Sequence, residues 1–446
     1  MRVLIVGGSD AGISAGLRIK ELEPNIDVNI LLRDNFPNYS ICGLPFLISG
    51  ETSDQVELAH RSNKQLVDAG LNVHQQVNVF SIDHMNRRVF ANDEKVFSYD
   101  SLILATGARS RHPKLEGANL PGVFTLRWMG DAIRMQKFME TNSPRRALIV
   151  GGGYIGLEMA DALHKKGLDV VLIEHNSAVL RTVHVDIGAE VAAKLALHGI
   201  KVQNNLRLTS IKLLNEGLDA ELSDGQHVNT DLVLLAVGAE PSNELADSAG
   251  LNLGSGGAIV VDQQMSTSVQ GIWAAGDCAE TYHRLLGRNI YMPLGTNAHK
   301  QGRISGENAI GGKRLYQGTL GTQVVKVFDL VVARTGFRKQ EAIKEAYQAF
   351  TVPFQCFTHK AYYPQAELLK FRVTGDQRDG KLLGAQMIGP WKHEVSKRLD
   401  TFANALFHGM KVDSISDLDL SYTPPLSSPW DPVQMAAQAW CNYHRS

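Results

Sequence analysis

The stretch RALIVGGGYIGLEMADALHKKGLDVVLIEH, from Arg146 to His175, reads as a strand, a glycine turn, a helix and a second strand. The turn carries the spacing of a dinucleotide-binding fingerprint, formed by Gly151, Gly153 and Gly156. Glycine is required there because a pyrophosphate approaches the backbone and rests on the helix N-terminus. The second strand, Asp169 to Ile173, is followed by Glu174, whose carboxylate can accept both ribose hydroxyls and would repel a 2′-phosphate. The stretch predicts a site that favours NADH over NADPH.

A second, more degenerate copy opens the chain as MRVLIVGGSDAG, Met1 to Gly12. An apolar run ends in the glycines, and a helical pattern follows from Ile13 to Leu22. Gly7 and Gly12 occupy the first and third fingerprint positions, and Ser9 stands where the second glycine is usual. The chain therefore contains two candidate dinucleotide sites.

Composition limits the class of protein. With 446 residues the chain is too long for one core and should form about three domains. It is 44% apolar, 20% charged and has a net charge of −1, so we expect no nucleic-acid or membrane partner. No apolar run approaches the roughly 20 residues of a membrane span. The cysteines lack metal-ligand spacing, which predicts a cytoplasmic protein with reduced thiols and no metal site; they are Cys42, Cys278, Cys356 and Cys441.

Three further stretches accompany the two turns. SLILATGARS (Ser101–Ser110) reads as a buried strand that leads into Ala105, Thr106 and Gly107. DLVLLAVGAEPSNELA (Asp231–Ala246) repeats this pattern with Gly238. TSVQGIWAAGDCAE (Thr267–Glu280) places Asp277 at the end of a strand, directly after Gly276, and a helical segment follows from Asn297.

Cys42 lies in FPNYSICGLPFLISGE, Phe36 to Glu51, between a turn and a predicted helix start near Leu44. Pro45 is comfortable in the first turn of a helix. The positive end of that helix would lower the thiol pKa from its usual value of about 8.5. The alternative is a buried, inert cysteine, since free cysteine is among the most buried residue types.

Together these stretches resemble the pyridine nucleotide-disulfide oxidoreductase family, the flavoprotein disulfide reductases with two dinucleotides, over nearly the whole chain. The resemblance implies an α/β fold like that of glutathione reductase, with two Rossmann-like dinucleotide-binding domains and a C-terminal α+β dimerisation domain. It divides the chain into an FAD-binding domain (1–113 and 243–318), an NAD(P)H-binding domain (114–242) and an interface domain (319–446).

Site residues follow from the same resemblance, position by position. Those for FAD are Gly7, Gly8, Ser9, Ala11, Gly12, Arg33, Ala105, Thr106, Gly107, Gly276, Asp277 and Ala298. Those for NADH or NADPH are Gly151, Gly153, Tyr154, Ile155, Gly156, Glu174 and Gly238. Tyr154 stands where the family commonly has an aromatic gate over the flavin, with ordinary packing as the alternative. One position departs from the family, because Leu32 stands where an acid for the FAD ribose is expected.

The cysteine segment resembles the single-cysteine branch of the family. Leu47 occupies the position of the second cysteine found in dithiol members. The pattern SxCGLPxxISG resembles coenzyme A-disulfide reductases, NADH peroxidases and NADH oxidases, in which a lone thiolate cycles through a sulfenic acid or a mixed disulfide. Asp10 stands where peroxidases and oxidases have a histidine, which favours disulfide reduction.

The C-terminal third adds tyrosines. KVFDLVVARTGF (Lys326–Phe337) opens the interface domain, and two later segments, AYYPQAELLKF and DLSYTPPLSSPWDP, resemble those of coenzyme A-disulfide reductases. There, tyrosines of the partner subunit line the thiol site, which implies a homodimer. Here they would be Tyr422 and either Tyr362 or Tyr363, with Tyr363 preferred; packing of an interface is the alternative. Candidate cations for the phosphates of coenzyme A, or mere surface charge, are Arg18, Lys20, Lys300 and Arg303.

The resemblance thus implies an FAD-dependent enzyme that passes electrons from NAD(P)H through Cys42 to a low-molecular-weight disulfide or persulfide. Coenzyme A disulfide is the first candidate and polysulfide the second. Two alternatives remain: reduction of peroxide or oxygen through a Cys42 sulfenate, and electron transfer to, or redox sensing with, a protein partner. A near-neutral chain without an evident docking patch argues against the latter.

Overall fold

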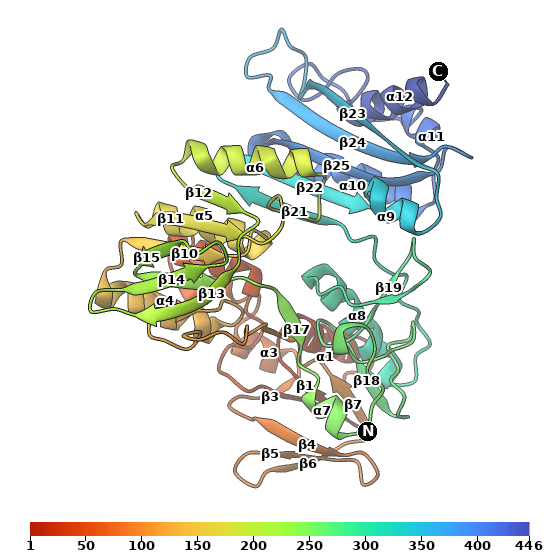
Figure 1. Cartoon of the computed structure of the whole chain (residues 1–446). Coiled ribbons are helices and arrows are strands. Elements are labelled where there is room, and N and C mark those ends of the chain that lie inside the picture. Colours follow the sequence, from red (N-terminus) through yellow and green to blue (C-terminus); the bar gives the residue numbers. More distant parts are fainter. Residues whose placement is uncertain (446) are drawn as a thin grey trace. The chain divides into compact units, whose positions relative to one another are not determined.

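The computed structural model of the chain describes residues 1–445. The chain forms two compact units, each built from several segments. The first unit comprises Met1–Pro144, Leu234–His283 and Gly287–Thr319. The second unit comprises Arg145–Val233, Arg284–Leu286 and Leu320–Ser446. Figure 1 follows the chain through both, from the red N-terminus to the blue C-terminus.

The first unit is built on a parallel five-stranded sheet. Adjacent strands pair in parallel throughout, as the near-continuous apolar runs in β1 and β7 predict for strands buried on both faces. In spatial order the strands are β18 (Ile272–Ala274), β7 (Ser101–Leu104), β1 (Arg2–Val6), β2 (Asp27–Leu31) and β3 (Asn72–His74).

Two parallel helices, α1 (Asp10–Leu22) and α8 (Gly295–Ala309), pack against each other with almost no space between their backbones. A Cβ added at Gly302 would collide with the backbone of Ala11, and one at Gly306 with that of Ala15. The glycines let the two helices approach, so α8 brings its first turn beside the glycine turn that precedes α1.

Smaller elements complete the first unit. Its remaining strands are β4 (Val79–Asp83), β5 (Arg88–Ala91), β6 (Val96–Ser98), β8 (Ala108–Ser110), β9 (Val123–Phe124), β17 (Ala239–Pro241), β19 (Thr281–His283) and β20 (Arg288–Ile290). Its other helices are α2 (Leu44–Ser49), α3 (Asn63–Asp68), α4 (Met129–Asn142) and α7 (Glu244–Ser248), with 3₁₀ turns at Ile41–Gly43, Gln55–Leu58 and Ser255–Gly257.

The second unit begins with another parallel strand–helix–strand arrangement. Strands β10 (Arg146–Val150), β11 (Asp169–Glu174) and β12 (Lys201–Asn204) pair in parallel. They are connected by α5 (Tyr154–Lys165) and α6 (Val185–Leu197). An antiparallel meander follows, made of β13 (Leu208–Leu213), β14 (Leu218–Leu222) and β15 (His227–Thr230). The chain leaves this unit within β16 (Leu232–Leu235).

The C-terminal part of the second unit is an antiparallel sheet covered by helices. The strand order is β21 (Gln323–Val327), β22 (Leu330–Gly336), β25 (Leu382–Pro390), β24 (Leu368–Asp376) and β23 (Ala349–Phe357). The helices are α9 (Lys339–Lys344), α10 (Val395–Phe407), α11 (Val412–Ser416) and α12 (Pro432–Arg445), with a 3₁₀ turn at Trp391–His393. Phe371, Phe402 and Trp440 are almost fully buried between sheet and helices.

The predicted architecture is confirmed: two glycine-turn α/β arrangements and a C-terminal α+β region. The helix expected near Leu44 begins at that residue. One strand boundary differs, because β18 ends at Ala274, three residues before Asp277, and a bend carries the chain onward. Among residues 1–445, every helix is too short or too polar to traverse a bilayer.

Candidate active site

The glycine turn after β1 is closed by contacts that exclude any side chain. Gly7 has a φ of +116°, and a Cβ there would overlap the carbonyl oxygen of Ala105 at the end of β7. A Cβ at Gly12 would overlap the carbonyl oxygen of Gly7. Both positions therefore require glycine, and the turn holds the end of β7 against the start of α1.

The segment after β7 is held by hydrogen bonds to Ser242, the residue that follows β17. The hydroxyl of Thr106 donates to the carbonyl of Ser242 at 2.6 Å, and the Ser242 amide donates to the carbonyl of Gly107 at 3.0 Å. Gly107 has a φ of +69°, which favours glycine. The predicted Ala105–Gly107 segment thus lies directly beside the glycine turn.

Asp277 lies in a buried corner of the same unit. Its carboxylate forms an ion pair with the Arg127 guanidinium, and each side chain is only 13% exposed. The preceding amide, of Gly276, donates to Gln301 at 2.9 Å. A Cβ at Gly276 would press on the methyl groups of Ala11 and Ala298. The structure therefore brings together predicted FAD residues from three distant segments.

Six buried side-chain polar atoms have no hydrogen-bond partner in the described part of this unit, and they include Asp10 Oδ1, Asn38 Oδ1, Arg127 Nε and Tyr291 Oη. Burial raises the pKa of Asp10, and burial followed by the charge of Asp277 raises that of Tyr291. Buried polar atoms are normally satisfied. The glycine cradle and these atoms fit a large polar ligand that carries phosphate groups, as FAD does.

The departure at the FAD ribose position has a structural counterpart. Leu32 is buried, and its side chain fills the space that a Cβ at Gly8 would need. Arg33 is exposed and lies over the ring of Trp128, 6.0 Å from its centroid. Asp34 accepts the amide of Phe36 at 2.9 Å, so its carboxylate supports the following turn.

The cysteine loop is pinned to the glycine turn. The Asn38 amide donates to the carbonyl of Gly8 at 2.8 Å, and the Asn38 carbonyl accepts the His60 amide at 2.9 Å. Cys42 follows in the 3₁₀ turn Ile41–Gly43, two residues before α2 begins. A Cβ at Gly43 would collide with Leu58, so the chain passes closely there. Backbone contacts thus place the cysteine loop next to the dinucleotide turn.

Exposure distinguishes Cys42 from the other cysteines. Cys42 is exposed, Cys278 is buried, and Cys356 and Cys441 are partly buried. Burial raises the pKa of Cys278, and it raises that of Cys356 to about 12. Since the thiolate is the reactive form, Cys278 and Cys356 are poor nucleophiles.

Two imidazoles lie near Asp10, at the start of α1. His299 Nε2 is 3.5 Å from Asp10 Oδ1, and its Nδ1 is 2.9 Å from the hydroxyl of Ser14. The rings of His60 and His299 meet edge to face, with centroids 6.3 Å apart. Both imidazoles lower the pKa of Asp10, although burial outweighs them. Sequence spacing alone did not indicate this cluster.

The glycine turn of the second unit repeats the first. Gly151 has a φ of +110°, and a Cβ at Gly156 would overlap the Gly151 carbonyl oxygen. A Cβ at Gly153 would meet nothing within 4 Å, so the turn is open above that residue. Glu174 is buried and accepts the amide of Gly152 at 2.7 Å. Gly238, also predicted for the nucleotide, belongs to the first unit.

Tyr154 and Ile155 begin α5 directly after this turn. Ile155 is 38% exposed, whereas Tyr154 is half-buried and its hydroxyl accepts a hydrogen bond from Thr182 at 3.3 Å. Burial raises the pKa of Tyr154, so its hydroxyl stays protonated at neutral pH.

The predicted tyrosines lie on the surface of the second unit. Tyr362 is 74% exposed, Tyr363 is 43% exposed and Tyr422 is 44% exposed. Desolvation, together with a hydrogen bond to Tyr362, raises the pKa of Tyr422. Tyr363 instead packs edge to face against His359, with centroids 5.7 Å apart. Of the two candidate neighbours, Tyr362 is the one that forms a hydrogen bond with Tyr422.

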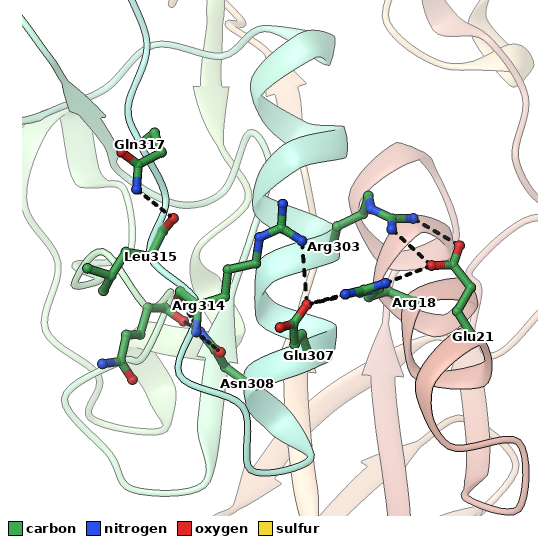
Figure 2. Close-up of polar contacts among 9 residues, drawn as sticks. Arg18, Glu21, Arg303, Glu307, Asn308, Arg314, Leu315 and Gln317 are labelled. Carbon is green, nitrogen blue, oxygen red and sulfur yellow. Dashed lines mark hydrogen bonds and ion pairs between the residues drawn. The ribbon is translucent and has the colours of Figure 1, made fainter.

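Three of the four candidate cations for coenzyme A already bind other groups of the chain, and Figure 2 shows two of them, Arg18 and Arg303. Arg18 pairs with Glu307 at 2.6 Å and with Glu21 at 3.0 Å, and both Arg303 nitrogens bind Glu21 at 2.9 Å. Hydrogen bonds from Arg303 and Arg18 lower the pKa of Glu21 to about 2. Lys20 donates to the carbonyl oxygens of Pro24 and Ile26. Lys300 is exposed.

Two residues of this site carried no recognisable sequence signal. Arg127 precedes α4, and its amide is fixed by the buried Asp131 at 2.8 Å. Gln301 is fully buried on α8, where it also donates to the carbonyl of Glu280 at 3.1 Å. A glutamine four residues after Asn297 in a helical pattern could have suggested a buried polar contact, but not its partner.

The two units and their glycine turns define a nucleotide-dependent oxidoreductase fold. Residues 1–302 match the family model described as pyridine nucleotide-disulphide oxidoreductase, and residues 322–432 match the dimerisation domain of that family. The chain belongs to the pyridine nucleotide-disulphide oxidoreductase family.

Individual relatives span almost the whole chain. It is 34% identical over 441 residues to the NAD(P)H coenzyme A polysulfide/persulfide reductase of Pyrococcus horikoshii, covering 98% of each chain. It is 30% identical over 445 residues to an NADH oxidase of Methanocaldococcus jannaschii, again covering 98% of each. The structure of reduced Bacillus anthracis CoADR-RHD superposes with a TM-score of 0.96 at 30% identity, covering 100% of this chain and 80% of that one.

A partly buried acid on α5, Glu158, should make the free energy of unfolding depend on pH. Burial raises the pKa of Glu158 to about 7, helped by Asp161 and opposed by Lys326. As pH rises above about 4.5, the unfolded chain ionises this carboxyl and the folded chain resists, so stability is lost until about pH 7. We expect the free energy of unfolding of Glu158→Gln, measured relative to wild type by denaturant unfolding, to rise by up to about 3 kcal/mol between pH 4.5 and pH 8.

The matched control is Glu216→Gln, which changes an exposed carboxyl in the loop between β13 and β14. Measured over the same pH range, it gives the effect of replacing an exposed glutamate by glutamine. A Glu158→Gln difference that is constant from pH 4.5 to pH 8 would contradict a raised pKa at that carboxyl.

Proposed function

We propose that the protein is an FAD-dependent enzyme that uses NADH to reduce a low-molecular-weight disulfide or persulfide through Cys42. The observation that carries this proposal is the exposed Cys42 thiol, which lies in a loop attached to the glycine turn of the first unit by the backbone hydrogen bond from Asn38 to Gly8. The family membership and the names of the relatives support the reaction class.

The first unit would hold FAD through the glycine turn, the Ala105–Gly107 segment and Asp277 with its partner Arg127. Their support is the cradle in which a Cβ at Gly7 or Gly12 would collide, with the unsatisfied buried polar atoms around it. When bound, the flavin supplies two-electron transfer between nucleotide and sulfur. The second unit would bind NADH, with Glu174 at the ribose.

The chain's own sulfur performs the bond-breaking step. The Cys42 thiolate attacks one sulfur of the substrate, the substrate S–S bond breaks, and the departing thiolate takes up a proton. Two electrons from NADH then reduce the mixed disulfide on Cys42, which releases the second thiol and restores the thiolate. The sum is RSSR + NADH + H⁺ → 2 RSH + NAD⁺. For a persulfide the products are RSH, H₂S and NAD⁺.

Tyr422 and Tyr362 would supply the proton to the departing thiolate from a partner subunit. The match to a dimerisation domain supports a homodimer, and the exposure of both rings suits a role at an interface. A raised pKa keeps the Tyr422 hydroxyl protonated, which suits a donor. The hydrogen bond between these rings favours Tyr362, in place of Tyr363, as the second tyrosine.

The charge pattern on α1 and α8 favours persulfide or a small disulfide over a ligand that needs several free cations. Arg18 and Arg303 are neutralised by Glu21 and Glu307. Coenzyme A would have to displace these pairs or use Lys300. Coenzyme A disulfide therefore ranks with polysulfide, not above it.

Peroxide or oxygen reduction is the second candidate. Position 10 carries an aspartate in place of a histidine, but the imidazoles of His299 and His60 lie close to Asp10 in space. The imidazole of His299, which lies on α8, could stabilise a departing hydroxide. The NADH oxidase among the relatives belongs to this class.

Cys42→Ser should retain flavin and still accept electrons from NADH, because the two glycine turns do not depend on the thiol. Turnover of coenzyme A disulfide and polysulfide should fall by at least about 10³-fold, in keeping with the loss of a nucleophile. Anaerobic stopped-flow bleaching of flavin absorbance and steady-state NADH oxidation measure the two steps. Cys278→Ser, a buried control, should leave both steps unchanged. Wild-type disulfide turnover by Cys42→Ser would refute the proposed function.

Tyr422→Phe removes only a hydroxyl, so the dimer should persist. Disulfide turnover should fall by about 10²-fold, the usual range for one general acid, while bleaching of the flavin by NADH is unchanged. Tyr362→Phe should behave similarly and Tyr363→Phe should not, because Tyr363 packs on His359. Full disulfide activity in a dimeric Tyr422→Phe enzyme would leave this tyrosine with a packing role only.

Wild-type enzyme should prefer NADH to NADPH by about ten-fold in kcat/KM, because a 2′-phosphate would meet the Glu174 carboxylate. His175 lies 3.0 Å from Glu174 and is the adjacent imidazole that could oppose this effect. Steady-state kinetics with both nucleotides at pH 8 measure the preference. Equal use of the two nucleotides would remove Glu174 from this role.

A further inference from the structure

The loop between β11 and α6 connects the nucleotide turn with the C-terminal sheet inside the second unit. At one end, the Leu180 amide donates to the carbonyl of Gly152 at 2.7 Å, and Leu180 itself has a φ of +52°. Immediately afterwards the loop presents three consecutive carbonyl groups to the C-terminal sheet; they belong to Arg181, Thr182 and Val183. We call the last part of this loop, residues 180–184, the bridging loop.

Two arginines of the C-terminal part bind these carbonyls. Arg334 on β22 donates to the Thr182 carbonyl at 2.5 Å, and its side chain is only 11% exposed. Arg338 donates to the carbonyls on either side of it, at 2.5 and 3.2 Å. The Glu341 carboxylate on α9 forms ion pairs with both guanidinium groups, at 3.2 Å from Arg334 and 2.8 Å from Arg338. The three side chains form a clamp on the bridging loop.

The clamp fixes the arginines electrostatically. Burial alone would raise the pKa of the Glu341 carboxyl, but the charge of Arg334 and the hydrogen bonds from Arg338 bring it below its ordinary value. Glu341 is therefore ionised at neutral pH and holds both cations in place. Planar guanidinium groups that are held this way keep one orientation toward their acceptors.

Thr182 connects the clamp with Tyr154. Its carbonyl is held by Arg334, and its hydroxyl donates to the Tyr154 hydroxyl at 3.3 Å. Arg334 also lies close enough to Tyr154 for its charge to lower the pKa of that phenol. A continuous path thus runs from Glu341 through Arg334 and Thr182 to the ring at the start of α5.

We propose that Thr182 and Arg334 are positioning residues that hold the Tyr154 ring in its closed position at the nucleotide turn. The inference rests on the role of Tyr154 as a nicotinamide gate in the proposed function. Moving the Tyr154 ring aside would break the hydrogen bond from Thr182. The free energy of that hydrogen bond would therefore weaken the binding of nicotinamide. The C-terminal sheet thereby sets how readily nicotinamide gains access, although it contributes no atom to the nucleotide turn.

The expected effect is a change in nicotinamide affinity, not in binding of the adenosine half. Thr182→Val removes the hydroxyl and keeps the branched shape. One neutral hydrogen bond corresponds to about two-fold to ten-fold in an equilibrium constant. NAD⁺ should therefore bind the Thr182→Val holoenzyme about two-fold to ten-fold more tightly, because the population with an open ring rises. ADP-ribose, which has no nicotinamide, should bind as it does to wild type.

Isothermal titration calorimetry of oxidised holoenzyme with NAD⁺ and with ADP-ribose makes the comparison. Thr182→Ser keeps the hydroxyl and should behave as wild type. Thr351→Val is the matched control, since it removes a hydroxyl from the 2.8 Å contact between Thr351 and Thr374 on β23 and β24. It should change neither affinity. Arg334→Lys should shift NAD⁺ affinity in the same direction as Thr182→Val, because lysine loses the two-pronged contact.

A double-mutant cycle with Tyr154→Phe decides whether Thr182 acts through the tyrosine. If it does, Tyr154→Phe reproduces the gain in NAD⁺ affinity and the double variant gains nothing more. A changed affinity in Tyr154→Phe with an unchanged one in Thr182→Val, or additive effects of the two, would overturn the inference alone. Unchanged NAD⁺ binding in both would also overturn the inference, whereas the gate role belongs to the aromatic ring, which Tyr154→Phe retains. The titrations need no electron acceptor, so their outcome is separate from the Cys42→Ser test.

Discussion

Close approach of backbone to backbone at the two glycine turns is the constraint on which the rest of the structure depends. At Gly7 and Gly12, and again at Gly156, a single added carbon would meet a carbonyl oxygen of the main chain. Main-chain atoms cannot rotate away as a flexible side chain would. Each turn therefore joins strand and helix in one geometry, with the helix N-terminus presented at the carboxyl edge of the sheet, where dinucleotides bind in this class of fold.

The first glycine turn and its neighbours contact the cysteine loop, β7, α8 and the segment that carries Asp277. The cysteine loop is attached through Gly8, β7 through Ala105, and α8 through its glycine contacts with α1. Asp277 is oriented by Arg127 and, through the Gly276 amide, by Gln301. The cysteine loop, the end of β7, α8 and Asp277 are thus connected to one another through the first glycine turn and its neighbouring contacts.

Much of this arrangement could be predicted from local patterns. Glycine spacing between an apolar run and a helical pattern identified both turns, and Gly43 and Pro45 located the start of α2 at Leu44. Such features are encoded within a few residues, because a turn or helix start has strict backbone demands. The placement of Asp277 was less accurate: a short bend after Ala274 leaves no distinct residue pattern.

Long-range polar pairing could not be predicted. Arg127 and Asp277 are separated by 150 positions, and Arg18 and Glu307 by 289. A chain with 45 basic and 46 acidic residues offers each charge many equivalent partners, and only the folded geometry selects one. For the same reason Arg18 and Arg303 could be read as phosphate ligands until Glu21 and Glu307 were seen beside them. The pairing of Tyr422 with Tyr362 likewise depends on surface geometry, not on spacing.

The division of the first unit into three chain segments has a consequence for biosynthesis. Its sheet receives β18, and its first helix receives α8, only after a stretch of nearly ninety residues that belongs to the second unit, Arg145–Val233. On the ribosome, α1 must wait for almost three hundred residues before the glycines of α8 can close over it. Contacts of such sequence separation are slow to form and leave apolar surface exposed in the meantime. The first unit therefore cannot complete its α1–α8 contact until Gly302 and Gly306 have been synthesised.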